Sequence, residues 1–181
     1  MEEKRGIESF QSACSHDGYI VDQARVTDVR YGCRFSDTNG CGWIAVYNLL
    51  RCLGDPVPHE EIVLALSRHS LFRGLLGTSP LRVQRYLKKH GHPTRMYVGR
   101  KAAAGAAETI QNGILVYRHT QGWHYVAFVR PGEDPGLRYF NAGLPSKRVL
   151  TMDAFLTEQN LTPFVLLLAP KGNAETPEGK C

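Results

Sequence analysis

No stretch of this 181-residue sequence stays apolar over the roughly 20 residues that a membrane-spanning helix needs. The N-terminal sequence Met-Glu-Glu-Lys-Arg-Gly-Ile also lacks the apolar segment of a secretory signal. We therefore expect a cytoplasmic protein that does not associate with membranes. Hydrophobic residues make up 43% and charged residues 22% of the chain, as in an ordinary globular domain. The length predicts one domain over residues 1–170, followed by a polar tail, 171–181, that we expect to be disordered.

The sequence has no C-x-x-C pair, which argues against a structural zinc site. Its odd, irregularly spaced set of cysteines does not indicate a disulfide framework. The five are Cys14, Cys33, Cys41, Cys52 and Cys181. Cys14 and His16 alone lie close together, which is a weak metal signal, so we expect neither metal nor cofactor. The formal net charge is +5, but no dense Lys/Arg run is present, so we expect no nucleic-acid partner.

Hydrophobic periodicity and turn residues predict helices in the first half of the chain and an antiparallel sheet in the second. The predicted helices are 42–53, 58–68, 79–90, 102–111 and 151–159. The predicted strands are 19–21, 95–98, 114–117, 123–129, 137–140 and 164–168. This pattern indicates an α+β fold. The helix over 42–53 is apolar around nearly its whole circumference, so we expect it in the centre of the domain.

Cys41 follows a Gly-containing turn and heads this central helix. A thiol at a helix N-terminus feels the positive end of the helix macrodipole, which favours the nucleophilic thiolate. The position therefore predicts a lowered pKa and faster labelling by iodoacetamide than at the other thiols. The alternative is a buried cysteine that only packs at a helix start, since cysteine is among the most buried residue types.

A thiol nucleophile needs a base, and the base needs an orienting group. His124 lies on the strand face that Val126 and Phe128 share, and Asn141 ends the next strand. If these strands pair, the Asn141 amide carbonyl could accept the imidazole N–H and set its tautomer. The alternatives are a core histidine and an ordinary turn asparagine. His119 is a second candidate base if the strand register differs.

Three short motifs in this order resemble the papain-like cysteine peptidases. They are Asn39-Gly-Cys-Gly-Trp-Ile-Ala, Gly122-Trp-His-Tyr-Val-Ala-Phe and Tyr139-Phe-Asn-Ala-Gly. The closest likeness is to the branch related to peptidases that cleave double-glycine leaders from bacteriocins, and it covers roughly Tyr31 to Leu168. The resemblance implies a papain-like fold, with Cys41 as nucleophile, His124 as base and Asn141 as the third member, and no cofactor.

The clan usually carries a glutamine about six residues before the cysteine as an oxyanion donor, and this chain has Phe35 there. Asn39, the backbone N–H of Cys41 and Arg34 are the candidate replacements. Trp43 and Trp123 each neighbour a catalytic candidate. We expect them either to pack in the core or to line a substrate cleft.

The resulting hypothesis is a thiol-dependent hydrolase, a peptidase or isopeptidase that acts on a peptide or small protein. Two alternatives stay open at this point. The same thioester could be resolved by an amine, in a transamidase, deamidase or acyltransferase. The missing glutamine also allows a catalytically inactive papain-like binding module.

Overall fold

The computed structural model describes residues 10–67, 77–120, 122–132, 135–143 and 148–172. The helical elements are η1 (Gln23–Arg25), α2 (Ser36–Asn39), α3 (Cys41–Cys52), α4 (His59–Ser67), α5 (Pro80–Lys89), α6 (Arg100–Ala107) and α7 (Met152–Gln159). The strands are β1 (Arg30–Tyr31), β2 (Arg34–Phe35), β3 (Thr94–Val98), β4 (Asn112–His119), β5 (Gly122–Val129), β6 (Leu137–Phe140), β7 (Val149–Leu150) and β8 (Val165–Pro170). Among the described residues, no helix is both long and apolar enough to cross a membrane.

A six-stranded antiparallel sheet organises the fold, in the order β3-β8-β4-β5-β6-β7. The hairpin of β4 and β5 forms its centre and places Tyr117 opposite His124. Strand β6 pairs with β5, so the chain leaves the sheet at Asn141 on the neighbour of the strand that carries His124. The predicted α+β fold with an antiparallel sheet is confirmed, including this strand pairing.

Helix α3 is the centre of the helical layer, as its all-round apolar sequence predicts. All residues from Gly42 to Leu50 are buried. The polar exception, Asn48, is fully buried and forms two hydrogen bonds with the main chain of Ile20, at 2.9 and 2.8 Å. This pairing satisfies the buried amide and fastens the N-terminal segment to the helix.

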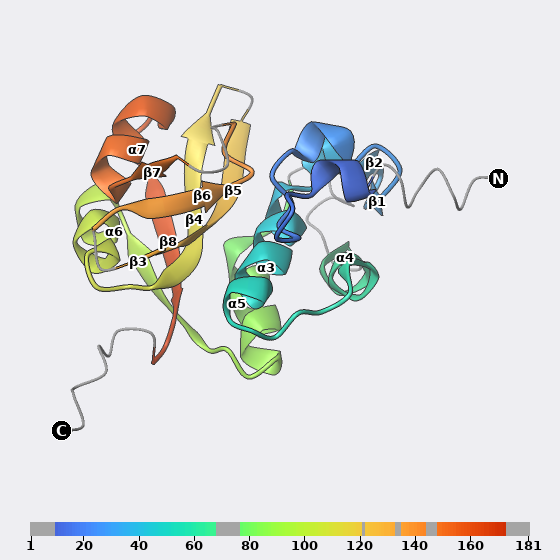
Figure 1. Cartoon of the computed structure of the whole chain (residues 1–181), viewed down its shortest axis with the longest axis horizontal. Coiled ribbons are helices and arrows are strands. Elements are labelled where there is room, and N and C mark those ends of the chain that lie inside the picture. Colours follow the sequence, from blue (N-terminus) through green and yellow to red (C-terminus); the bar gives the residue numbers. More distant parts are fainter. Residues whose placement is uncertain (1–9, 68–76, 121, 133–134, 144–147, 173–181) are drawn as a thin grey trace.

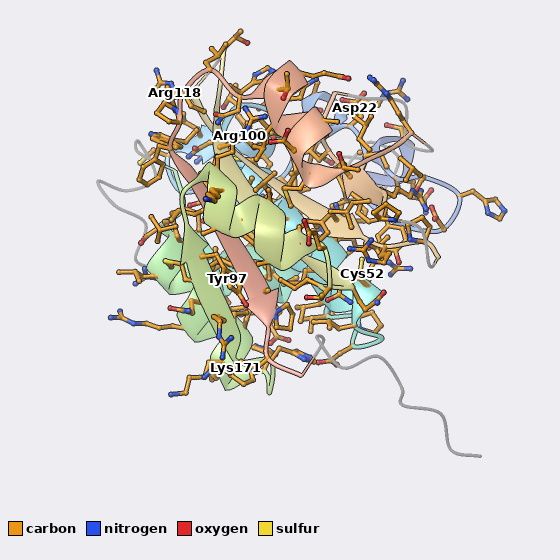
Figure 2. All side chains as sticks on the ribbon, turned by 90° about the vertical axis from the view of Figure 1, so that its left-hand side faces the viewer. Asp22, Cys52, Tyr97, Arg100, Arg118 and Lys171 are labelled. Atoms are coloured by element: carbon orange, nitrogen blue, oxygen red, sulfur yellow. The ribbon has the colours of Figure 1, made fainter. Side chains whose placement is uncertain are left out.

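The sheet separates two hydrophobic cores because successive side chains of a strand point to opposite faces. Tyr125 and Ala127 of β5 face α3, α4 and α5, whereas Val126 and Phe128 face α6 and α7. Figure 1 shows the helical layer of α3 to α5 on one side of the sheet and α6 with α7 on the other. Seen from the latter side, α6 lies across β3 and β8 (Figure 2). The sheet is therefore covered on both faces.

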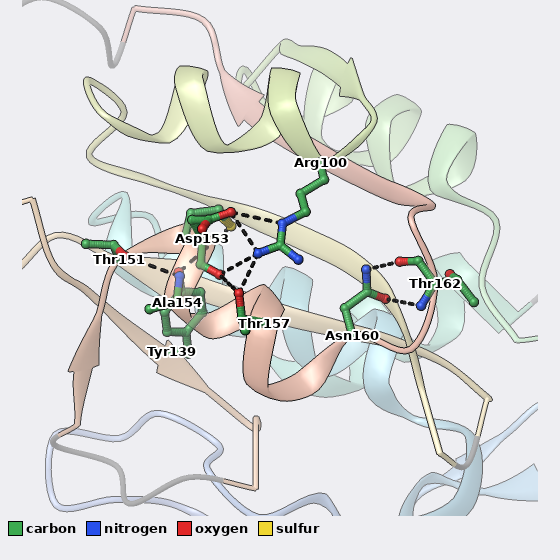
Figure 3. Close-up of polar contacts among 9 residues, drawn as sticks. Arg100, Tyr139, Thr151, Asp153, Ala154, Thr157, Asn160 and Thr162 are labelled. Carbon is green, nitrogen blue, oxygen red and sulfur yellow. Dashed lines mark hydrogen bonds and ion pairs between the residues drawn. The ribbon is translucent and has the colours of Figure 1, made fainter.

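An arginine fastens the two helices of the outer layer to each other. Arg100, at the start of α6, donates to the Asp153 carboxylate at 2.8 and 2.9 Å and to the Thr157 hydroxyl at 2.5 Å (Figure 3). Helix α7 itself begins at a side-chain cap, because the Thr151 hydroxyl accepts from the Ala154 N–H at 3.3 Å. This confirms Thr151 as the predicted helix start.

Several predicted bounds differ from the structure. The helix predicted over 102–111 runs from Arg100 to Ala107, and the predicted strand 19–21 is a single bridge between Cys14 and Ile20. The strand predicted over 114–117 extends from Asn112 to His119. Position 68, at the end of the predicted helix 58–68, and positions 173–181 of the predicted tail lie outside the described residues.

Candidate functional site

A cleft of about 1040 Å³ opens where the N-terminal segment meets the ends of α2, α3 and the central strands. It is the place where the two halves of the chain come together. Its walls are formed by Ser12, Cys14, Val21, Asp22, Gln23, Ala24, Arg25, Asp37, Thr38, Cys41, Tyr117, His119, Gly122, Trp123, His124, Asn141, Ala142 and Gly143. The structure thus brings Cys41, His124 and Asn141 to one cleft.

Cys41 is the first residue of α3 and is half-buried in the cleft wall. Its sulfur lies 4.0 Å from the carbonyl oxygen of Trp123, the residue that precedes His124 on β5. The helix start is packed tightly here, because a Cβ added at Gly42 would overlap the side chain of Thr78. Thr78 is in turn held by the hydroxyls of Tyr31, at 2.6 Å, and Tyr125. The glycine after the cysteine therefore allows the nucleophile's helix to approach this cluster.

Burial raises the pKa of the Cys41 thiol to about 11. The main-chain N–H groups of Tyr125, Gly42 and Cys41 itself favour the thiolate, but they oppose the rise only in part. The sequence-based prediction of a lowered pKa is therefore wrong. Desolvation of a thiolate in this wall outweighs the helix N-terminus, which acts as a partial charge of only about +0.5. At neutral pH the thiol keeps its proton.

His124 is a neutral imidazole with one basic ring nitrogen. Its Nε2 lies 2.7 Å from the main-chain carbonyl oxygen of Asn141. A carbonyl oxygen only accepts hydrogen bonds, so Nε2 carries the hydrogen and Nδ1 is the free basic nitrogen of the neutral ring. Burial lowers the pKa of His124, the bond to Asn141 opposes this, and nearby His119 adds to the lowering. The imidazole is thus neutral at neutral pH and able to accept a proton.

Asn141 contacts His124, but through a different group than predicted. The main-chain carbonyl holds the imidazole, whereas the side-chain amide turns away and pairs with Gln23. Asn141 has a positive φ of 61° and is 6% exposed. Asparagine adopts this left-handed conformation more readily than most residues. Asn141 is therefore a turn asparagine, the alternative named from the sequence, and it also accepts from His124 through its main-chain carbonyl.

Of the remaining predicted site residues, only Trp123 lines the cleft, and Trp43 and Asn39 do not. Trp123 lines the cleft and is 48% exposed, whereas Trp43 is fully buried and donates its indole N–H to Ser36 at 3.0 Å. Asn39 is absent from the cleft wall, and its amide oxygen faces Gly77, where an added Cβ would lie 3.6 Å from it. Trp43 is thus not in position to touch a substrate in the cleft.

Two further residues of the cleft lie close to the candidate triad: His119, which the sequence offered only as an alternative base, and Gln23, which it did not single out. His119 lies with its ring centroid 6.0 Å from that of His124, close enough to influence its charge. Gln23, which lies 18 positions before Cys41 and so outside the segment where the clan carries its glutamine, contacts Asn141 directly. The one nearby sequence feature that could have pointed to Gln23 is Asp22, whose carboxylate caps the short helix η1 that Gln23 begins.

The described residues contain no group of three or more histidine, cysteine, aspartate or glutamate side chains arranged to hold a metal ion. A thiol, a neutral imidazole with a set tautomer and a helix N-terminus line one cleft, and acyl transfer through a thioester requires such groups.

No family model matches the sequence, and no curated protein sequence matches it. Among the solved structures that are similar to this one are two peptidases. One is the peptidase domain of Streptococcus ComA, a bifunctional ABC transporter involved in quorum sensing. It shows a TM-score of 0.51 and 20% identity over 75% of this chain and 94% of that one. The other is a double-glycine motif protease from an AMS/PCAT transporter, in complex with its leader peptide. It shows a TM-score of 0.46 and 14% identity over 72% and 84% of the two chains.

The similarity to the ComA peptidase domain establishes the fold at this level of identity, and the fold alone. It confirms the papain-like fold that the sequence motifs predict. The roles of the residues in the cleft rest on the geometry of this chain.

Proposed function

We propose that this protein is a thiol-dependent hydrolase that cleaves an amide bond in a peptide or protein substrate, with Cys41 as nucleophile and His124 as general base. The observation that carries the proposal is the 2.7 Å bond from His124 to the Asn141 carbonyl, in the cleft that Cys41 also lines. That bond leaves Nδ1 as the basic nitrogen of the imidazole. The fold similarity to a peptidase domain supports an amide substrate.

The proposed reaction has two halves. As the Cys41 sulfur bonds to the scissile carbonyl carbon, Nδ1 of His124 takes the thiol proton, and the carbonyl oxygen becomes an oxyanion. The imidazolium then gives this proton to the leaving amine as the C–N bond breaks. In the second half, water attacks the thioester and gives a proton to His124. The acid product departs, and that proton returns to the sulfur.

The oxyanion needs hydrogen-bond donors at the start of α3. The first N–H groups of a helix have no partner within the helix, and their dipoles favour a negative charge. Because Cys41 is the first residue of α3, its main-chain N–H is the candidate donor, and the Asn39 side chain does not line the cleft. Losing one side-chain donor typically costs about 10²–10³ in rate, so we expect a slower enzyme than one with a complete oxyanion site.

Trp123 supplies an apolar wall for the substrate. Its half-exposed ring meets Phe164 edge to face, with ring centroids 4.9 Å apart, and Phe164 is itself 46% exposed. The exposed Trp123 ring in the cleft wall, extended by Phe164, fits a substrate segment with an apolar side chain, because burying these rings against a ligand removes a large apolar area from water.

A peptide library analysed by mass spectrometry tests the proposal. The wild type, Cys41→Ser, His124→Gln and the control Cys33→Ser, which alters an exposed thiol outside the cleft, are incubated with unstructured peptides. We expect cleavage by the wild type and the control, and a loss of at least about 10³-fold in the two site variants. Unchanged cleavage by Cys41→Ser would contradict the proposal.

A second arm adds a labelled primary amine at millimolar concentration. Hydrolysis yields a free carboxylate, whereas an acyltransferase yields the amide of the labelled amine, since both reactions share the thioester. Amine adducts that dominate over acids would replace the hydrolase by a transferase. A wild type that forms neither product would contradict both and favour a binding module.

A further inference from the structure

Gln23 forms hydrogen bonds to both sides of the candidate site. It begins η1 and is half-buried in the cleft wall, 18 positions before Cys41 in the sequence. The short helix is held by Asp22, whose carboxylate accepts from the Ala24 N–H at 3.1 Å. This cap fixes the backbone of η1, so the main-chain N–H and the side chain of Gln23 both lie at the cleft wall.

The first side is Asn141, to which Gln23 is bonded twice. The Gln23 main-chain N–H donates to the Asn141 Oδ1 at 2.9 Å, and the Asn141 Nδ2 donates to the Gln23 Oε1 at 3.1 Å. These bonds join residues 118 positions apart. They use both ends of the Asn141 amide, so the side chain has one defined orientation.

The second side is the segment that leads into the nucleophile. The Gln23 Nε2 donates to the main-chain carbonyl of Asp37 at 3.1 Å, within α2 and four positions before Cys41. One glutamine side chain therefore accepts from the half of the site that holds His124 and donates to the half that carries Cys41.

The two Asn141 bonds bear on the base because of the backbone at that position. A residue at φ 61° sits in a small region of allowed conformations, and its carbonyl direction is set by that conformation. The carbonyl is the group that holds Nε2 of His124. Fixing the Asn141 side chain from both ends keeps the residue in this conformation and so keeps the carbonyl aimed at the imidazole.

We infer that Gln23 is a positioning residue, which holds Asn141 so that its carbonyl selects the His124 tautomer with a free Nδ1, and which ties this unit to the segment before Cys41. The inference rests on the proposed function for its effect on rate, but the tautomer itself does not depend on any substrate. Misplacement of a reacting group by about 1 Å can cost about 10²-fold in rate. We therefore expect a loss of about 10–100-fold in kcat when the Gln23 amide is removed, with KM changed less than about twofold.

Gln23→Met is the decisive variant, because methionine has a similar length and neither donates nor accepts as an amide does. Gln84→Met is its matched control, since the Gln84 Nε2 also donates to one main-chain carbonyl, that of Thr94 at 3.1 Å, outside the cleft. Gln23→Glu keeps an acceptor for the Asn141 amide but cannot donate to Asp37. If Gln23→Met does not fold, Gln23→Glu serves as the test variant instead.

The readout is the imidazole ¹⁵N and Nε2–H NMR signal of His124, measured beside kcat, KM and the thermal unfolding midpoint. We expect Gln23→Met to lose the protected Nε2–H signal and to mix the two tautomers, while Gln84→Met keeps the wild-type signal. Gln23→Glu should keep the signal and lose part of kcat. A Gln23→Met protein with a wild-type His124 signal and the kcat of Gln84→Met would overturn the inference.

The two proposals can fail separately. If the wild type cleaves no peptide but Gln23→Met changes the His124 signal, the hydrolase proposal fails and the positioning role of Gln23 stands. If Cys41→Ser abolishes cleavage while Gln23→Met leaves both signal and kcat unchanged, the hydrolase stands and Gln23 is only part of the cleft wall.

Discussion

The protonation state of Cys41 gives the sharpest quantitative prediction. With a pKa raised to about 11, the thiolate fraction at pH 7 is about 10⁻⁴. A free cysteine with a pKa of about 8.5 is about 3% thiolate at that pH, a ratio of about 300. The higher pKa makes each thiolate more nucleophilic, and a Brønsted slope of 0.4–0.5 over about 2.5 units recovers about 10–20-fold. We therefore expect Cys41 to react with iodoacetamide about 15–30-fold more slowly than free cysteine at pH 7.

The assay follows one tryptic peptide. Cleavage after Arg34 and Arg51 releases residues 35–51, which contain Cys41 as their sole cysteine. Its alkylated fraction, measured by mass spectrometry between pH 6 and pH 11, gives the rate for this thiol alone. Because partial burial slows the reagent at every pH, the slope is a better readout than the absolute rate. We expect a tenfold rise per pH unit up to about pH 10.

A rate that is flat between pH 5 and pH 8 would refute this reasoning, because it would mean a thiolate already formed beside an imidazolium. His124→Gln is the control. If the resting pair is neutral, removing the imidazole leaves the alkylation profile within about threefold of the wild type, since little thiolate is stabilised by a charge on His124.

Three further predictions concern stability. Gly42→Ala should lower the free energy of unfolding by about 1–3 kcal/mol, measured by urea unfolding, because the added Cβ overlaps Thr78; an unchanged midpoint would show that Thr78 yields freely. Asn48→Leu should cost about 2–5 kcal/mol in the same assay, because it strands a buried N–H and C=O of Ile20, and a loss under 1 kcal/mol would contradict this. The folded pKa of His124 is lowered, so the stability that its neutral form contributes is present above the unfolded pKa of about 6.5 and is lost as the pH falls. Between pH 7 and pH 5 the thermal unfolding midpoint should therefore fall less for His124→Gln than for the wild type. Equal falls would contradict the assigned shift.

The parts of the fold that rest on local patterns could be predicted from the sequence. Helix α3 is recognisable because apolar residues surround it, and β5 because it is a short run of aromatic and β-branched residues that reads as a strand buried on both faces. The pairing of β5 with β6 follows from their nearness in the chain. The place of β8 between β3 and β4 does not, because that order joins segments far apart in the sequence. No local signal reports such a crossover.

The site shows the same division. Cys41 and His124 could be proposed because a helix start and a strand face are local features. Three properties depend on contacts between distant segments. The pairing of Gln23 with Asn141 spans 118 positions, the Asn141 carbonyl rather than its side chain meets His124, and the Cys41 pKa follows from burial. A sequence indicates which groups are present, but their solvation is set by the folded surroundings.

Because a main-chain carbonyl accepts from His124, the His124 imidazole and the Cys41 thiol are both neutral before reaction. A carboxylate in that place would stabilise the imidazolium by a full charge, whereas a carbonyl offers a dipole, which does not compensate for burial. Under the proposed mechanism the proton therefore moves from Cys41 to Nδ1 during attack, not before it. The pH dependence of kcat/KM then has its acid limb at the lowered pKa of His124 and its alkaline limb near the thiol value of about 11, so the active range is broad and extends above neutral pH.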